Sequence, residues 1–162
     1  IIMIQIIDEC LSEEICNDLI SHLENNKNIH NTYYPNNNNR IFITYINLRD
    51  IKKFYPLIDQ INKYVKGLNN CEIHKLQVVK WPNNCSQGLH YDKTLSKTVY
   101  SSIGYLNDEY MGGQTFFEEG TIFKPIKGRV LFFDGMKYKH GVTPVKNGPR
   151  YTLASWYKRI EK

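Results

Sequence analysis

The sequence predicts a mostly β protein, an antiparallel jelly roll backed by helices near the N-terminus. Aromatic residues, which favour strands, make up 13% of the 162 residues, with twelve Tyr, seven Phe and two Trp. From residue 72 onward, short β-like runs alternate with turn signals, whereas the first 70 residues contain two stretches with helical periodicity. Helices followed by at least six strands are typical of a jelly roll that is covered by helices.

The N-terminal segment is predicted to begin with a strand and a helix. Ile2–Ile7 is apolar, short and without a basic flank, which favours a first strand over a signal peptide. Asp8 or Ser12 then starts a helix that runs to about Asn25. Its apolar side contains Ile15, Leu19, Ile20 and Leu23.

A loop, a strand and a second helix are predicted to follow. Asn25–Arg40 contains eight Asn residues, which favour turns because their side chains compete for backbone hydrogen bonds. Within it, Tyr33-Tyr34-Pro35 either contacts a substrate or belongs to a solvated linker. Arg40–Leu48 alternates like a strand, and Asp50 caps a helix that runs to about Lys66. The buried side of this helix holds Phe54, Leu57, Ile58, Ile61 and Val65.

The C-terminal part is predicted to form the sheets. Gly112-Gly113, Asn147-Gly148-Pro149 and other turn formers separate its strand-like runs. The length of 162 residues predicts one domain over residues 1–162, with helical support in 1–70 and a jelly-roll core in 71–160, and 41% hydrophobic residues are enough to form its core. The strand-like runs are Glu72–Trp81, Thr98–Leu106, Thr115–Phe117, Thr121–Phe123, Arg129–Phe133 and Arg150–Tyr157.

Composition narrows the classes of partner. No apolar run approaches the ~20 residues of a membrane-spanning helix. The net charge of +5 suits an anionic small molecule or an acidic partner, whereas scattered Lys residues without a basic helix do not favour nucleic acid. The cysteines form no C-x-x-C pair, so we expect free thiols in a reducing, cytoplasmic compartment. They are Cys10, Cys16, Cys71 and Cys85.

Three residues form a pattern that is typical of a metal site. His90 and Asp92 lie two apart, and on an extended segment both side chains face the same way. His140 follows about fifty positions later. Two His and one carboxylate in this order are the ligand set of the facial triad that holds Fe(II) and leaves the opposite face open. Alone, His-x-Asp also fits a surface loop, and His140 also fits a structural role.

Arg150 is the fourth candidate residue. It opens the last predicted strand, on the same face as Thr152 and Trp156. An inward-facing Arg in an apolar strand is unfavourable unless it meets an anion, and its planar group fits a carboxylate through two hydrogen bonds. Ten residues after His140, it is suited to hold a dicarboxylate that chelates the metal. A solvated Arg is the alternative.

From about Lys75 to Arg159, the sequence resembles the Fe(II)- and 2-oxoglutarate-dependent dioxygenases, specifically their prolyl-hydroxylase-like branch. The most specific motif is His140–Tyr151, which has the family's pattern H-x-V-x-P-V-x-x-G-x-R-Y. The preceding motifs, in order, are Leu76–Pro82, Gly88–Asp92, Ser102–Asn107 followed by Gly112–Phe117, and Pro125–Asp134.

The resemblance implies a double-stranded β-helix and a set of site residues. 2-Oxoglutarate is the implied co-substrate, O2 the oxidant, and ascorbate a further candidate cofactor. The distal carboxylate of 2-oxoglutarate would pair with Arg150, and Tyr105 lies where the family often places a phenol that binds the same carboxylate. Trp156 would pack against the pocket, with Thr152 as a polar group in it. The implied iron ligands are His90, Asp92 and His140.

The resemblance also directs the expectation for the substrate. Collagen-type prolyl hydroxylases usually carry Lys where this chain has Arg150, and many prolyl hydroxylases carry Tyr where it has Trp81. Both changes leave the reaction class intact. We expect hydroxylation of a C–H bond in a peptide or protein, first of all in a prolyl residue. Trp81 and Tyr91 offer flat surfaces for a pyrrolidine ring. The flanking mobile loops are Trp81–Leu89, Lys93–Lys97 and Asn31–Arg40.

Several alternatives stay open at this point. The hydroxylated group could be a Lys or Asn residue, or a small molecule capped by the same loops. A nucleic-acid demethylase of the same chemistry is disfavoured, because such relatives carry extra arginines after the second His and here only Arg150 and Arg159 follow it. A jelly-roll binding module without turnover is the third alternative. The sequence carries no signal of oligomeric state.

Overall fold

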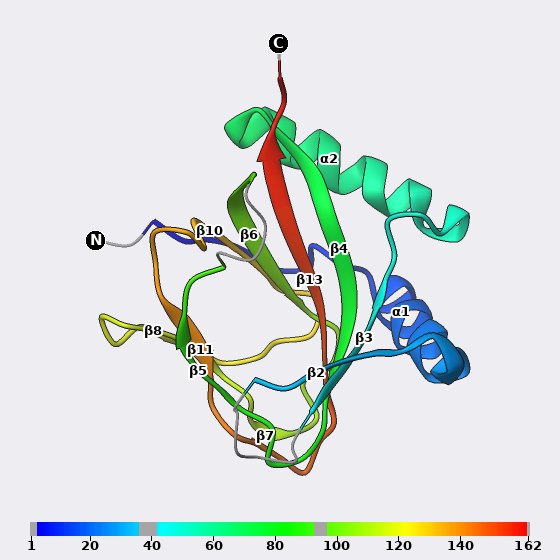
Figure 1. The fold of residues 1–162 in the computed structure, drawn as a ribbon, viewed down its shortest axis with the longest axis vertical. Coiled ribbons are helices and arrows are strands. Elements are labelled where there is room, and N and C mark those ends of the chain that lie inside the picture. Colours follow the sequence, from blue (N-terminus) through cyan, green and yellow to red (C-terminus); the bar gives the residue numbers. More distant parts are fainter. Residues whose placement is uncertain (1–2, 36–41, 93–96, 162) are drawn as a thin grey trace.

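The computed structural model describes residues 3–35, 42–92 and 97–161. In this part of the chain, two antiparallel sheets face each other (Figure 1). The larger sheet runs in the order β1 (Gln5–Ile7), β10 (Val130–Phe133), β6 (Thr98–Tyr105), β13 (Arg150–Arg159), β4 (Cys71–Trp81), β3 (Ile43–Asn47) and β2 (Asn31–Tyr33). The smaller sheet runs in the order β5 (Gln87–His90), β11 (His140–Val142), β8 (Thr115–Phe117) and β9 (Ile122–Phe123).

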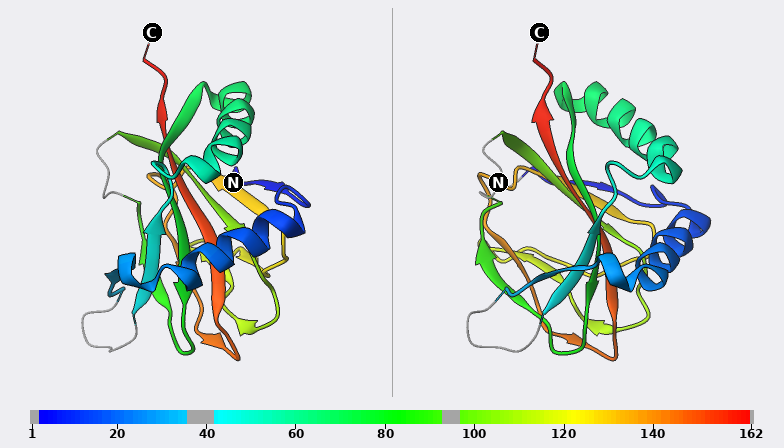
Figure 2. Two further views of the ribbon diagram at one scale, coloured as in Figure 1. Left: turned by 90° about the vertical axis from the view of Figure 1, so that its right-hand side faces the viewer. Right: turned by 45° about the vertical axis from the view of Figure 1, so that its right-hand side comes forward.

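Two helices cover the outer side of the larger sheet, and the smaller sheet covers its other side (Figures 1 and 2). They are α1 (Glu13–Asn25) and α2 (Tyr55–Asn69). A short ribbon of β7 (Met111–Gly112) and β12 (Val145–Lys146) lies at one end. The predicted fold class, a mostly β jelly roll backed by helices, is therefore confirmed. No helix in the described ranges is long and apolar enough to span a membrane.

Strand β13 divides the interior into two parts, because successive side chains of a strand point to opposite faces. Tyr151, Leu153 and Tyr157 belong to the main core beneath the helices. Arg150 and Thr152 alternate with them and therefore face the smaller sheet. Both of these polar residues are nevertheless buried. The outer face of β13 thus carries the apolar core, and its inner face carries the polar candidates.

Helix α1 begins where the sequence predicts. The Ser12 side chain accepts a hydrogen bond of 3.2 Å from the Ile15 backbone N–H, and Glu13 and Glu14 follow in the first turn. The buried side of the helix packs into the main core through Cys16, Leu19 and Leu23, all 0% exposed.

The start of α2 differs from the prediction. Asp50 does not cap it, because a 3₁₀ turn over Lys52–Phe54 intervenes and α2 begins at Tyr55 without a side-chain cap. Pro56 occupies the first turn, where its missing N–H leaves no bond unmade.

The predicted loop Asn25–Arg40 is partly ordered structure. It contains a 3₁₀ turn over Lys27–Ile29 and strand β2, which pairs with β3. Because the partner strand lies outside the Asn-rich segment, the segment itself shows no alternating pattern that would predict a strand. Residues 36–40 of the predicted loop lie outside the described residues.

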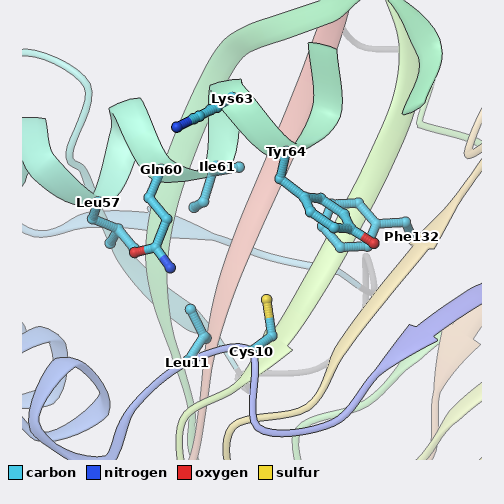
Figure 3. A pocket seen from close by; sticks show the side chains of 8 residues that line it. All are labelled: Cys10, Leu11, Leu57, Gln60, Ile61, Lys63, Tyr64 and Phe132. Carbon is cyan, nitrogen blue, oxygen red and sulfur yellow. The ribbon is translucent and has the colours of Figure 1, made fainter. Parts of the chain in front are cut away.

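A cavity of about 280 Å³ lies under α2, away from the polar candidates. Figure 3 shows Tyr64 of α2 over Phe132 of β10, with Cys10 and Leu11 on the opposite side of the hollow. The two rings have centroids 5.4 Å apart. The lining is mainly apolar and contains no histidine, so this hollow is a gap between α2 and the sheet edge rather than the predicted site.

We expect Leu19→Ala to lower the free energy of unfolding by about 2–5 kcal/mol, because it removes a fully buried side chain from the core between α1 and the sheet. Urea unfolding measures this change. Asp18→Ala, on the exposed side of the same helix, is the matched control and should stay within about 0.5 kcal/mol of the unmodified protein. Equal losses in both variants would contradict the packing described for α1.

Candidate metal centre and anion pocket

Two paired strands of the smaller sheet bring the predicted histidines together. His140 on β11 lies directly opposite His90 on β5, although fifty residues separate them in the chain. Their ring centroids are 4.4 Å apart. Asp92 follows β5, and its carboxylate oxygen and one nitrogen of each ring all lie within 4.8 Å of one another. The structure therefore gathers the three residues that the sequence singled out.

The orientation of the two rings leaves one nitrogen of each available. His90 Nδ1 lies 2.9 Å from the Gly88 carbonyl oxygen, and His140 Nδ1 lies 3.2 Å from that of Tyr138. A proton on Nδ1 is donated to these carbonyls, which leaves the Nε2 lone pairs free to bind a metal. The Nε2 atoms of His90 and His140 lie 3.6 and 3.5 Å from Asp92 Oδ1.

Asp92 is fixed from the side opposite the histidines. Ser101 donates a hydrogen bond of 2.6 Å to Oδ2, and the Asp92 backbone N–H donates to the Gly135 carbonyl at 2.9 Å. Any Cβ at position 135 would collide with the Asp92 carboxylate and the Ser101 hydroxyl, so only glycine fits this approach.

The Asp92 carboxylate is held in its charged form. Burial raises the pKa of its carboxyl group, but hydrogen bonds from His140, His90 and Ser101 and the charge of His140 outweigh burial, and the net shift is downward. A buried carboxylate that stays ionised needs a cation. Two imidazole nitrogens with one carboxylate are a donor set that fits Fe(II).

Arg150 is buried without a counter-ion. It is 1% exposed, and among the described residues no carboxylate pairs with it. Its Nε donates to the Gly113 carbonyl at 3.0 Å, while its Nη2 meets no acceptor. The guanidinium carbon lies 4.8 Å from the Trp81 ring centroid and 5.7 Å from that of Tyr105. A buried charge in this state is a preformed anion site.

Hydroxyl groups surround the Arg150 guanidinium. The Tyr105 hydroxyl lies 2.6 Å from Thr115 Oγ1, and both side chains are fully buried. Thr152 pairs with Tyr105 across the sheet and is also buried. The Tyr110 hydroxyl is buried beside Arg150. Burial raises the pKa of both Tyr105 and Tyr110, so these phenols keep their protons and can donate to an anion.

The structure separates the two predicted substrate residues. Trp81 is 6% exposed and covers Arg150, so its ring lies in the anion pocket rather than at the mouth. Tyr91 lies beside Lys139, whose Nζ is 5.5 Å from the ring centroid. Trp156 pairs with Ser101 and is half-buried. Residues 93–96 of the predicted Lys93–Lys97 loop lie outside the described residues.

Sequence reasoning missed several residues of the site. Ser101 could have been found by counting back in steps of two along β6 from Tyr105, since such residues share a face. Thr115 and Tyr110 flank the Gly112-Gly113 turn, and nothing local indicates that this turn folds against Arg150. Strands β5 and β11 were also missed, because each is short and glycine-containing.

A jelly roll that carries a His-x-Asp…His cluster beside a buried arginine defines a class of iron-dependent oxygenases. The sequence profile described as "2OG-Fe(II) oxygenase superfamily" matches residues 76–158. The chain belongs to this superfamily, whose members use Fe(II), 2-oxoglutarate and O2.

Solved structures of prolyl hydroxylases share the fold. A viral collagen prolyl hydroxylase from Paramecium bursaria Chlorella virus-1, in its 2-oxoglutarate complex, is 20% identical with a TM-score of 0.73 over 98% of this chain and 96% of that chain. A prolyl hydroxylase from Trichoplax adhaerens, in complex with a peptide fragment of the hypoxia inducible factor, is 20% identical with a TM-score of 0.74 over 96% of this chain and 83% of that chain.

A sequence relative is prolyl 3-hydroxylase 3 of Homo sapiens, which is 40% identical over 65 residues. The match covers 36% of this chain and only 9% of the human protein.

We expect Ser101→Ala to weaken metal binding by about 10- to 100-fold, because the hydroxyl that orients Asp92 is lost. Titration of the apoprotein with Fe(II) under argon, or with Mn(II), measures the affinity. Ser102→Ala is the matched control, since Ser102 points to the other face and bonds the Tyr157 hydroxyl at 2.7 Å. It should reduce stability and leave metal affinity unchanged. A loss of metal affinity in Ser102→Ala but not in Ser101→Ala would mean that Ser101 does not position Asp92.

Proposed function

We propose that this chain is a dioxygenase that hydroxylates a prolyl residue in a peptide or protein. In this proposal, Arg150 binds the distal carboxylate of 2-oxoglutarate, and the iron ligands are His90, Asp92 and His140. The observation that carries the proposal is the buried Arg150 guanidinium, which lies on the inner face of the sheet and pairs with no carboxylate of the described residues. A three-residue metal cluster alone also fits a binding module, whereas a metal cluster with a separate buried cation fits a dicarboxylate that reaches both.

When bound, Fe(II) and 2-oxoglutarate supply the oxidation of an unactivated C–H bond by O2, with succinate and CO2 as the other products. The chain contributes charge and position. Asp92 provides one negative charge that its hydrogen bonds keep ionised. Arg150, Tyr105 and Tyr110 direct donors at one carboxylate, and Trp81 shields that contact from water.

The prolyl substrate is supported by the named relatives, since the similar solved structures and the human protein are prolyl hydroxylases. With Trp81 buried, Tyr91 is the remaining predicted substrate residue, and further surface for a peptide must come from elsewhere. Tyr33 and Tyr34 are exposed at the end of β2, and Tyr34 lies against the exposed Phe42 with centroids 6.2 Å apart. We assign these aromatic side chains, rather than Trp81, as the stacking surface for the substrate.

The test of the proposed function is succinate release from 2-oxoglutarate, measured with Pro-, Lys- and Asn-containing peptides, free amino acids and oligonucleotides. We expect stimulation by proline peptides, and loss of all stimulated turnover in His140→Ala, because two ligands do not complete the triad. Full turnover in His140→Ala would overturn the assignment of the metal site. Stimulation by oligonucleotides alone would replace the prolyl substrate with a nucleic acid.

We expect Arg150→Ala to weaken 2-oxoglutarate binding by about two to four orders of magnitude, since removing one partner of a buried charge pair costs about 3–5 kcal/mol. Arg150→Lys keeps the charge but loses the planar fork, so its loss should be smaller. Calorimetry with metal-loaded protein measures both. Arg129→Ala, which breaks only a surface pair with Asp8, is the control. An unchanged affinity in Arg150→Ala would place the carboxylate anchor elsewhere.

A further inference from the structure

Lys75 lies on the inner face of the larger sheet, in the same row as the serine that anchors Asp92. Lys75 on β4 pairs with Trp156 on β13, and Trp156 pairs with Ser101 on β6. Because neighbouring strands lie about 4.8 Å apart, the Lys75 backbone is about 10 Å from that of Ser101. Lys75 therefore lies near the metal cluster on the inner face of the larger sheet.

The Lys75 ammonium has no counter-ion in the part of the chain that the structure describes. No acidic side chain in the described ranges pairs with it, and neither 36–41 nor 93–96 contains an acidic residue. Its contacts are aromatic, with Nζ 5.2 Å from the Trp156 ring centroid and 5.7 Å from that of Tyr45. Burial lowers the pKa of Lys75, so water only partly solvates the charge.

Two further donors beside Lys75 are unsatisfied. Gln77 lies two residues along the same face and is 5% exposed, and its Nε2 meets no acceptor in the described part of the chain. The Trp156 indole N–H is buried and equally unpaired. A buried donor without an acceptor is destabilising. One acceptor-rich group placed over this row would satisfy the ammonium and the neutral donors together.

This row is remote from the Arg150 end of the 2-oxoglutarate site. Trp156 is six residues from Arg150 along β13, and Lys75 is six residues from Trp81 along β4. At about 3.4 Å per residue, the two positions are about 20 Å apart along the sheet. The co-substrate carboxylate that Arg150 holds cannot also satisfy Lys75.

We propose that Lys75, Gln77 and Trp156 form a second anion subsite, which receives a carboxylate of the molecule that is hydroxylated. The inference rests on the proposed function and adds a substrate class to it. One ammonium flanked by neutral N–H groups matches the single charge and two oxygens of a carboxylate. The carboxylate comes from an Asp or Glu side chain next to the target residue of a peptide, or from the main-chain carboxylate of a free amino acid.

Turnover with matched substrates separates these two sources. Three peptides carry the same target residue flanked by Asp, Asn or Lys, and free proline supplies only a main-chain carboxylate. We expect the Asp peptide to exceed the Asn peptide in kcat/KM by about 10- to 100-fold, since a hydrogen bond to a charged group contributes about that factor. Preference for free proline over all three peptides would assign the subsite to the main-chain carboxylate.

Variants at position 75 test the assignment of the residue. We expect Lys75→Met to remove the preference for the Asp peptide, Lys75→Glu to shift it to the Lys peptide, and Lys75→Arg to keep it. Lys124→Glu makes the same charge change on an exposed loop and should leave the preference intact. An unchanged preference in both Lys75→Met and Lys75→Glu would overturn the proposal.

A binding measurement keeps this test independent of catalysis. The chain has two Trp residues, so Trp81→Phe leaves Trp156 as the only indole reporter of binding. Succinate release is measured with Trp81 in place, because this ring covers Arg150. We expect its emission to change on titration with the Asp peptide but not the Asn peptide, and Lys75→Met to abolish the change. Acid-selective binding without succinate release would defeat the proposed function alone. Succinate release without acid-selective binding would defeat this inference alone.

Discussion

The alternation of side chains along β13 is the constraint on which the rest of the structure depends. This strand is paired on both sides, with β4 and with β6. Its odd-numbered residues 151, 153 and 157 fill the core beneath the helices, and its even-numbered residues face the smaller sheet. A slip of one residue would exchange the two sets. Arg150 would then enter the apolar core, and Tyr151 and Leu153 would block the pocket. The register of one strand therefore defines both the core and the site.

The polar inner face has an energetic consequence for the outer face. An uncompensated buried charge costs several kcal/mol, which is comparable to the whole 5–15 kcal/mol stability of a typical domain. The hydrogen bond from Arg150 to the Gly113 carbonyl and the contacts of its guanidinium with the surrounding rings offset part of this free-energy cost. The remainder must come from apolar burial elsewhere, and the helices supply it. Leu19 and Leu23 of α1 are fully buried against the sheet. The apolar core beneath the helices thus offsets the cost of burying Arg150 in the site.

The sequence predicts the fold class and the metal cluster better than it predicts the surroundings of the site. His90, Asp92 and His140 were found because metal ligands must be particular residue types at particular spacings. Lys75 and Gln77 were missed, because β4 is buried on both faces and Leu76, Val78 and Val79 obscure its two-residue period. Trp81 was assigned to the substrate, whereas only the pairing of β4 with β13 places it over Arg150. Asp50 has the composition of a helix cap, but the 3₁₀ turn that follows it overrides this local preference.

The separation of the two cations bears on how the site fills. The Arg150 and Lys75 backbones are about 20 Å apart along the sheet, and for two charges at that separation, with an effective dielectric constant of about 20, Coulomb's law gives an interaction of roughly 0.8 kcal/mol. Each cation therefore influences an anion at the other position by less than a factor of about five. The 2-oxoglutarate carboxylate at Arg150 therefore changes the field at Lys75 little, whereas the end of the molecule at the metal cluster lies closer to the row of Lys75 and Ser101. A binding order that arises from charge therefore depends on the metal end of the site, where Ser101 holds Asp92.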